Sequence, residues 1–343
     1  MAITLVVGAE ASGSRTQGSE MVAEHTMPPV ESGSQARARF LFSIVTPSLD
    51  QGRYISDALS SVRCQENVRC EHVVMDAGSC DGTVDILSEA EGSLRFFVEP
   101  DDGQSDALNK GFKLARGSIL GWLNADDFYL RGALAVVERC FASNPEVQVV
   151  YGDAVIVDEN GCVIRGLNQH GPDLAMLLYY GCYIPSTTTF FRSDLLDSGL
   201  LRLDTSLRLA MDLDLFIRLA KAGVKFAYLP RELAAFRWHQ QAKTLLGGPS
   251  GMRERSEIQA RYGAATNSEL ALEVLRTLYR VKHGIKKILS GAYGRQFRWS
   301  RARAQSMRWW DVDIRGQGAS QNLPDDAEGC GSQAHRGSQE DAM

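Results

Sequence analysis

Short apolar runs alternate with amphipathic segments through the first part of the chain. The apolar runs are too short for helices and predict buried strands, whereas the segments between them predict helices. The predicted strands span residues 40–46, 71–76, 94–99 and 119–124, and the predicted helices span 54–62, 83–90 and 105–115. Strands separated by single helices form right-handed βαβ units. The pattern therefore predicts an α/β fold with a mostly parallel central sheet flanked by helices.

The remainder of the chain is less regular. Strands are expected at 147–157 and 186–191, a helix at 211–222, and a C-terminal helical, basic appendage at 252–310. Residues 1–39 and 311–343 are polar, small and without periodicity, which predicts a disordered leader and a disordered tail. The sequence thus leaves one folded domain, at 40–245.

Composition narrows the classes of function. The 343 residues are 44% apolar with a net charge of −5, so the chain can bury a large core and has no overall nucleic-acid footprint. The seven cysteines include no C-x-x-C pair, which fits a reducing compartment better than a disulfide framework. The first residues lack a signal-peptide pattern, and no window has the run of about 18 apolar residues that spans a bilayer. These features predict a cytoplasmic protein.

Acidic side chains gather where the predicted strands end, at Asp50, Asp76 and the motif Asn124-Ala-Asp-Asp127. Ligands of open α/β sheets bind at the carboxyl ends of the strands. Carboxylates this close together repel one another unless a cation neutralises them. Mg²⁺ and Mn²⁺ suit such a place, because they take one or two carboxylates plus phosphate oxygens of a substrate. The alternative is a strand end at which Asp127 caps the next segment.

A second polar turn runs from Asp76 to Thr83. A carboxylate at the end of a strand accepts hydrogen bonds from a base or ribose at other nucleotide sites. The glycines of this turn match neither the dinucleotide fingerprint nor the NTPase loop. The alternative is a helix-capping turn that binds nothing.

Together these segments resemble the motifs of the family 2 inverting glycosyltransferases, which have the GT-A fold. The order and spacing match over residues 40–245, in Thr46-Pro-Ser-Leu-Asp50, Asp76-Ala-Gly-Ser-Cys-Asp-Gly-Thr83, Asp106-Ala-Leu-Asn-Lys-Gly111 and Asn124-Ala-Asp-Asp127. The resemblance implies a nucleotide half at 40–130 and an acceptor half at 131–245. It also implies sugar transfer from a nucleoside-diphosphate-sugar to a carbohydrate or lipid-linked acceptor, in bacterial polysaccharide or glycolipid synthesis.

A fifth motif, Leu209-Ala-Met-Asp-Leu-Asp-Leu-Phe, carries the general base that the resemblance implies, Asp212. An apolar stripe follows it at helical spacing, so Asp212 is expected in the first turn, where the helix dipole favours the anion. Met211 stands where the family usually has Glu, which we interpret as a change in the surroundings of the base. The alternative is an Asp that only stabilises the helix.

The resemblance assigns the other site residues by position. Asp126 matches the metal-bridging acid, with Asp127 beside it, and His239 is expected to complete the metal shell around Mn²⁺ or Mg²⁺, although a structural His239 is the alternative. Asn124 replaces the commoner Asp, which predicts a weaker metal affinity. The donor-binding residues implied are Pro47, Ser48, Asp50, Asp76, Asp106, Asn109, Asn124, Arg237 and Lys243.

Residues 276–308 hold ten Lys or Arg and no Asp or Glu. Such cations suit an anionic membrane surface over 276–310, and would make the protein peripheral on the inner face of the membrane. Nucleic-acid binding or a solvated helix face are the alternatives. In the latter, Leu275, Leu278, Val281, Ile285 and Leu289 would pack on the catalytic domain. The aromatic residues expected to favour the membrane are Phe297, Trp299, Trp309 and Trp310.

Two further classes of protein fit part of the pattern. A nucleotidyltransferase has similar sheets and metal sites, but its usual Gly-rich basic loop is missing from residues 46–54. A non-catalytic sugar-binding module would keep the fold and need not keep Asp212.

Overall fold

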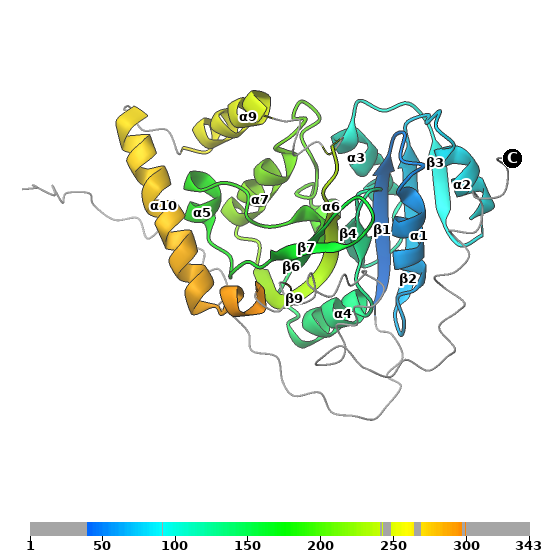
Figure 1. The fold of residues 1–343 in the computed structure, drawn as a ribbon, viewed down its shortest axis with the longest axis horizontal. Helices are drawn as coiled ribbons and strands as arrows, with labels where there is room; N and C mark the ends of the chain where they lie inside the picture. Colours follow the sequence, from blue (N-terminus) through cyan, green and yellow to red (C-terminus); the bar gives the residue numbers. More distant parts are fainter. Residues whose placement is uncertain are drawn as a thin grey trace, which may run out of the picture.

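The computed structural model describes residues 40–90, 92–240, 242, 248–263, 269–296 and 299. The described residues form a nine-stranded sheet with the order β3-β2-β1-β4-β8-β6-β9-β5, and β7 pairs with β6. Figure 1 shows this sheet at the centre of the molecule with helices on either side. The predicted leader and tail lie outside the described residues.

The first half of the sheet is parallel. β1 (Leu41–Ser48) pairs with β2 (Arg69–Asp76) and β4 (Ile119–Trp122), and β2 pairs with β3 (Arg95–Val98). The connecting helices are α1 (Ile55–Arg63), α2 (Thr83–Glu89) and α3 (Gln104–Leu114). The α/β fold class is confirmed, and each of these elements was expected from the spacing of apolar residues.

The second half of the sheet is mixed. β8 (Thr189–Arg192) runs antiparallel to β4 and to β6 (Val149–Val157), while β9 (Phe226–Arg237) runs parallel to β6. β5 (Phe128–Tyr129) and β7 (Val163–Leu167) pair antiparallel with β9 and β6. The helices here are α4 (Ala133–Ser143), α5 (Leu174–Tyr179), α6 (Asp194–Asp197) and α7 (Met211–Lys221). Of these elements, the sequence predicted only β6, β8 and α7.

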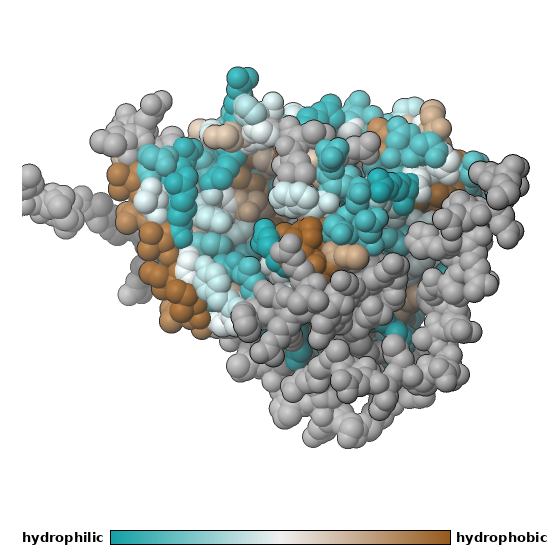
Figure 2. Space-filling model, viewed as in Figure 1, coloured by the Kyte–Doolittle hydropathy of each residue, from teal (hydrophilic) through white to brown (hydrophobic). Residues whose placement is uncertain are grey.

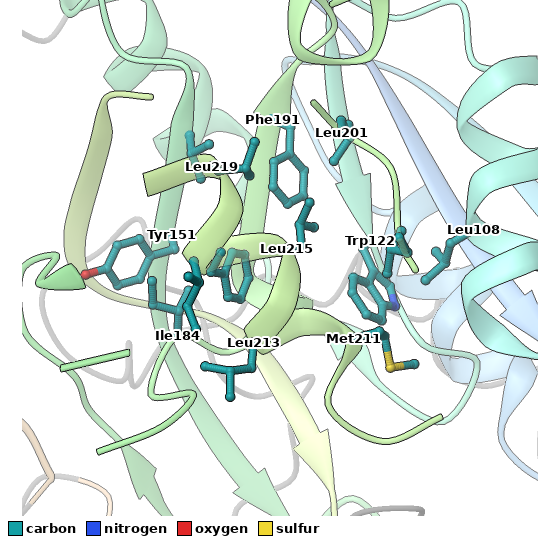
Figure 3. Close-up of a cluster of buried hydrophobic side chains, with 14 of the residues drawn as sticks. Leu108, Trp122, Tyr151, Ile184, Phe191, Leu201, Met211, Leu213, Leu215 and Leu219 are labelled. Carbon is teal, nitrogen blue, oxygen red and sulfur yellow. The ribbon is translucent and has the colours of Figure 1, made fainter. Parts of the chain in front are cut away.

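Alternation along the strands gives each face of the sheet its own core. Val45 and Phe191 pack with α3 and α7 on one face, whereas their neighbours Ile44 and Phe190 pack with α1 and α4 on the other. Figure 3 shows the first core, with side chains of α7 gathered against the sheet. The apolar stripe of α7 is therefore buried, which fixes its first turn at the end of β4.

Two helices follow the sheet, α9 (Gly248–Arg261) and α10 (Glu269–Leu289), and α10 runs along the edge of the molecule beside α5 (Figure 1). Leu278, Val281, Ile285 and Leu289 are exposed, so the alternative in which these residues pack on the domain is wrong. Trp299 is buried and donates its indole N–H to Glu232 (2.9 Å), so its expected place at a membrane is also wrong. Phe297, Trp309 and Trp310 lie outside the described residues. None of the described helices is long and apolar enough to cross a bilayer.

Candidate active site

A pocket of about 700 Å³ opens where β1 and β2 end. Ser48 pairs with Asp76 in the parallel register, which places the two strand ends side by side. The loops that follow the two strands form the walls. The lining residues are Leu49, Asp50, Gln51, Arg53, Tyr54, Cys80 and Asp81. Two motifs that are far apart in the sequence thus meet in one pocket.

Asp76 and Asp50 hold the two loops together. The carboxylate of buried Asp76 accepts hydrogen bonds from the N–H groups of Gly78 (3.0 Å) and Ser79 (2.8 Å) and from the Ser79 hydroxyl (2.7 Å). Asp50 has a φ of 52°, accepts from the N–H of Cys80 (2.9 Å) and donates its own N–H to the Ser79 hydroxyl (2.8 Å). Asp76 therefore shapes the turn from within, whereas Asp50 lines the pocket and is exposed to it.

Two buried polar atoms beside the pocket have no hydrogen-bond partner among the described residues. They are the Ser48 hydroxyl oxygen and the Gln51 side-chain carbonyl oxygen. An unsatisfied buried polar group costs on the order of 1–3 kcal/mol. A polar ligand in the pocket would supply the missing partners. Pro47, by contrast, pairs with Met75 inside the sheet and contributes strand geometry.

Asp106 and Asn109 are not among the residues that line this pocket. Asp106 pairs with Lys110 one helical turn later (3.0 Å). The Asn109 amide exchanges two hydrogen bonds with the backbone of Leu203, each 2.9 Å long. Asn109 thus ties α3 to the segment that leads into α7.

The three polar residues after β4 have three different environments. Asn124 accepts from the amide of Gln104 and the indole N–H of Trp122 (both 2.8 Å) and donates to Asp127 (2.9 Å). Asp127 is buried, and it also accepts from the Thr187 hydroxyl (2.8 Å) and the Arg237 N–H (3.0 Å). Burial, together with the charge of Asp126, raises the pKa of Asp127 to about 7.

Asp126 is the carboxylate of this motif that remains accessible. Its side chain is 24% exposed, and one oxygen lies 3.0 Å from Nε2 of His239. The His239 ring packs against Tyr54, with ring centroids 4.8 Å apart, and Tyr54 also lines the pocket. The structure therefore brings Asp126, His239 and the pocket wall together.

Arg237 does not reach toward a ligand. Its side chain is 2% exposed and its guanidinium contacts Asp57 (2.5 Å) and the backbone carbonyls of Asp126 (2.9 Å) and Glu159 (2.8 Å). The group also lies over the ring of Tyr54, at 4.9 Å. The expected role of Arg237 in holding a diphosphate does not fit this burial, and we assign it to positioning. Lys243 lies outside the described residues.

A divalent cation fits part of the expected ligand set. Among the described residues, no group of three or more His, Cys, Asp or Glu side chains is arranged to hold a metal. Asp126 and His239 offer one oxygen and one nitrogen, and such ions usually take their other ligands from substrate phosphates and water. Asp127 does not fit as a ligand, because both its oxygens already accept hydrogen bonds within the protein.

Asp212 lies in the first turn of α7, next to the thiol of Cys182. One carboxylate oxygen accepts from the N–H of Leu213 (2.7 Å). Burial raises the pKa of Asp212, and the hydrogen bonds from Leu213 and Cys182 oppose that rise. A carboxylate with a raised pKa and few donors is suited to accept a proton.

Met211 links this turn to the end of β4. It is buried in the same cluster as Trp122, and Figure 3 shows the two side chains beside one another. The Trp122 indole N–H is the donor to Asn124 described above. The sequence departs from the expected motifs at Asn124 and Met211. Asn124 bonds Trp122 and Met211 is buried in the same cluster as Trp122, so the two departures meet at one side chain.

Four residues support the site through contacts that the sequence did not predict. Asp57 neutralises Arg237, Gln104 and Thr187 hold Asn124 and Asp127, and Cys182 contacts Asp212. Each comes from an element far from its partner in the chain. No local spacing could have signalled these pairs.

Comparisons with known proteins agree with this geometry. The family described as "Glycosyl transferase family 2" matches residues 43–191. An uncharacterized glycosyltransferase of Nostoc sp. is 27% identical over 167 residues, which cover 45% of this chain and 52% of that protein. The O-antigen biosynthesis protein RfbC of Myxococcus xanthus is 28% identical over 269 residues, 75% of this chain and 20% of that protein. The chain thus spans about half the length of the Nostoc relative.

A solved structure has a related fold. S. aureus TarS in complex with UDP-GlcNAc superposes with a TM-score of 0.52 at 16% identity, covering 77% of this chain and 79% of that one. The fold is of the GT-A type. The likeness to glycosyl transferase family 2 thus covers residues 43–191, somewhat under half of the chain.

Proposed function

We propose that this protein transfers a sugar from a nucleoside-diphosphate-sugar to an acceptor hydroxyl by a single displacement that inverts the anomeric centre. One observation carries the proposal. The pocket after β1 and β2, the Asp126–His239 pair and Asp212 are held at the ends of neighbouring elements of the first core. These are a ligand pocket, an accessible carboxylate and a base, which such a transfer requires.

The pocket between Asp50 and Cys80 is the proposed nucleoside site. Its unsatisfied Ser48 and Gln51 oxygens support a ligand rich in hydrogen-bonding groups. TarS binds UDP-GlcNAc on a similar fold, which supports a nucleotide-sugar donor here. The Asp126–His239 pair is close to Tyr54 in the pocket wall, and so is placed for the diphosphate end of that donor.

Asp212 is the proposed general base. Its carboxylate accepts the proton of the acceptor hydroxyl while the acceptor oxygen bonds to the anomeric carbon. The bond from that carbon to the diphosphate oxygen breaks with its electron pair on the nucleoside diphosphate. Cys182 and the Leu213 N–H hold the carboxylate in place during this step.

A divalent cation, Mn²⁺ or Mg²⁺, is proposed at Asp126 and His239, where it would neutralise charge on the departing diphosphate. Arg237 supports the pair from behind, because it bonds the Asp126 carbonyl and underlies Tyr54. Asp127 keeps the turn after β4 in shape through its three donors.

The acceptor is proposed to be a carbohydrate or a lipid-linked sugar in the synthesis of a surface polysaccharide or glycolipid. The name of the Myxococcus relative, an O-antigen biosynthesis protein, supports this class. The chain covers only 20% of that relative, so the relative supplies the class of pathway and no substrate.

A panel of nucleotide sugars tests the proposal, with thermal shift and donor hydrolysis as readouts. One donor should stabilise the protein in the presence of Mn²⁺ and be hydrolysed slowly. Asp126→Asn should weaken donor binding by ~10–100-fold or more. Loss of a residue that only supports a metal ligand already costs this much, and Asp126 is proposed as the ligand itself. Asp158→Asn, in the turn after β6, is the matched control and should bind normally. No stabilisation by any donor, with or without metal, would contradict the proposed function.

A further inference from the structure

A row of apolar side chains faces outward along α10. Val274, Leu278, Val281, Ile285 and Ile288 are 52%, 58%, 58%, 51% and 65% exposed. Their spacing of four, three, four and three residues places them on one side of a helix. Figure 2 shows apolar side chains down the edge of the molecule where Figure 1 draws α10. We call these five residues the outer face of α10.

The opposite side of α10 is what attaches it to the protein. Tyr279 stacks on Tyr179 (5.0 Å between ring centroids) and His283 stacks on Tyr180 (4.3 Å). Lys286 pairs with Asp173 at the start of α5 (2.7 Å). The helix is therefore already docked, and its outer face points away from the domain.

Most of the charges beside the outer face are positive, and the exception is Glu273, which pairs with Arg280 (3.4 Å). Arg280 and Lys282 lie on either side of it, with side chains 61% and 45% exposed. From Arg276 to Leu289 the chain contains five Lys or Arg and no Asp or Glu. A partner helix packed on this face would normally be matched by charges of both signs along the flanks. A flat anionic surface needs only cations there.

We propose that the outer face of α10 binds in the plane of an anionic membrane. The five apolar side chains would enter the headgroup boundary, while Arg280 and Lys282 would exchange their partners Glu273 and Asp173 for lipid phosphates. An amphipathic helix with a cationic polar side and modest overall hydrophobicity binds membranes in this way. The proposed membrane-binding surface is one side of α10 and does not include the whole basic segment 276–310.

Membrane binding would also orient the proposed active site. Tyr180, which stacks on α10, is two residues before Cys182, and Cys182 contacts Asp212. Residues 180–182 thus contact both α10 and the proposed base Asp212. Membrane binding itself does not require the proposed function, but delivery of a lipid-linked acceptor to Asp212 rests on it.

Vesicle flotation of the full chain tests the surface, with phosphatidylcholine alone or mixed with phosphatidylglycerol. The wild type should float with the anionic vesicles at low salt and not with neutral ones. Leu278→Ser combined with Ile285→Ser should reduce partitioning by about tenfold or more, and Arg280→Gln by about fivefold. Met252→Ser on α9, where Met252 is 71% exposed, is the matched control and should float like the wild type.

Several results would overturn the proposal. They are equal flotation of the double variant, equal flotation with neutral vesicles, or no flotation of the wild type. A concentration-dependent dimer that the double variant abolishes, without vesicle binding, would assign the face to a second copy of the chain. Circular dichroism confirms that the variants keep their helix, and donor hydrolysis without vesicles is measured in parallel. If a donor is hydrolysed but the protein does not float, only the proposed membrane surface is wrong. If the protein floats but hydrolyses no donor, only the proposed function is wrong.

Discussion

The proposed donor side, around the pocket after β1 and β2, and the proposed acceptor side, around Asp212, use aspartates in opposite ways. Asp76 and Asp127, at the ends of β2 and of β4, each accept three hydrogen bonds from the protein. Asp212, at the start of α7, accepts from Leu213 and the Cys182 thiol. Burial raises the pKa of both Asp127 and Asp212, so the number of donors makes the difference: a carboxylate surrounded by donors fixes a turn, whereas one with few donors can take up a proton. The same residue type therefore holds loops and turns on one side and is the proposed general base on the other.

The largest expected effect comes from a substitution that changes only the acceptor side. Asp212→Asn should lower the transfer rate about 10²–10⁴-fold, because the amide cannot accept the acceptor proton. Donor affinity, measured by calorimetry, should be nearly unchanged, because the donor side is intact. Asp214→Asn is the control on the same helix, since Asp214 pairs with Arg218 and Arg261 instead. Unchanged transfer in Asp212→Asn would remove this residue from the mechanism.

An intermediate effect sharpens the contrast on the donor side. Arg237→Met should lower the free energy of unfolding by about 3 kcal/mol, because it leaves Asp57 and two backbone carbonyls without their partner. Arg53→Met removes an exposed ion pair with Glu159 and should cost under about 1 kcal/mol. Chemical denaturation of both variants measures the difference. Equal losses would mean that Arg237 does not hold the donor side together.

Much of the donor side was predictable from the sequence, because its residues follow regular strands and helices. Asp50, Asp76 and the motif at 124–127 were expected at strand ends and are found there. Their individual roles were not predictable. Arg237 was expected to hold a ligand, and only the folded chain reveals Asp57 beside it, 180 residues away.

The acceptor side was less predictable because its contacts are between distant segments. The apolar spacing of α7 predicted the helix and the position of Asp212, but Cys182 gave no local signal. β9 was missed because Pro230 and two charged residues interrupt its apolar pattern. α4 was also missed, although its buried positions follow a helical spacing.

The smallest expected effect concerns the attachment of α10 to the acceptor side. Burial lowers the pKa values of His170 and His283 to about 4, and Lys286 and Lys287 act in the same direction while Asp173 opposes it at His170. His170 Nδ1 lies 2.7 Å from the Gly171 carbonyl, so this nitrogen carries the proton and Nε2 accepts from His283 (3.0 Å). Adding a proton to Nε2 would set two donors against each other.

Unfolded histidines titrate near pH 6.5, so the unfolded chain binds more protons between about pH 6.5 and pH 4. The stability from this pair is complete above that window and is lost as pH falls through it, by about 1 kcal/mol per histidine after allowance for partial exposure. The protection of α10 amides, which is the intrinsic exchange rate relative to the observed rate at each pH, should therefore fall on acidification, and less so in His283→Gln. If the protection of α10 amides depends on pH identically in His283→Gln and in the wild type, the His170–His283 pair does not contribute to the attachment of α10.

The configuration of the product tests the central claim most directly. Proton NMR can follow the anomeric signal of the donor sugar into the product while the wild-type enzyme turns over. A single displacement assisted by Asp212 predicts that the product has the opposite anomeric configuration to the donor from the first turnover. A product that retains the configuration of the donor would contradict the account, because it requires an intermediate that this arrangement of Asp212 does not provide.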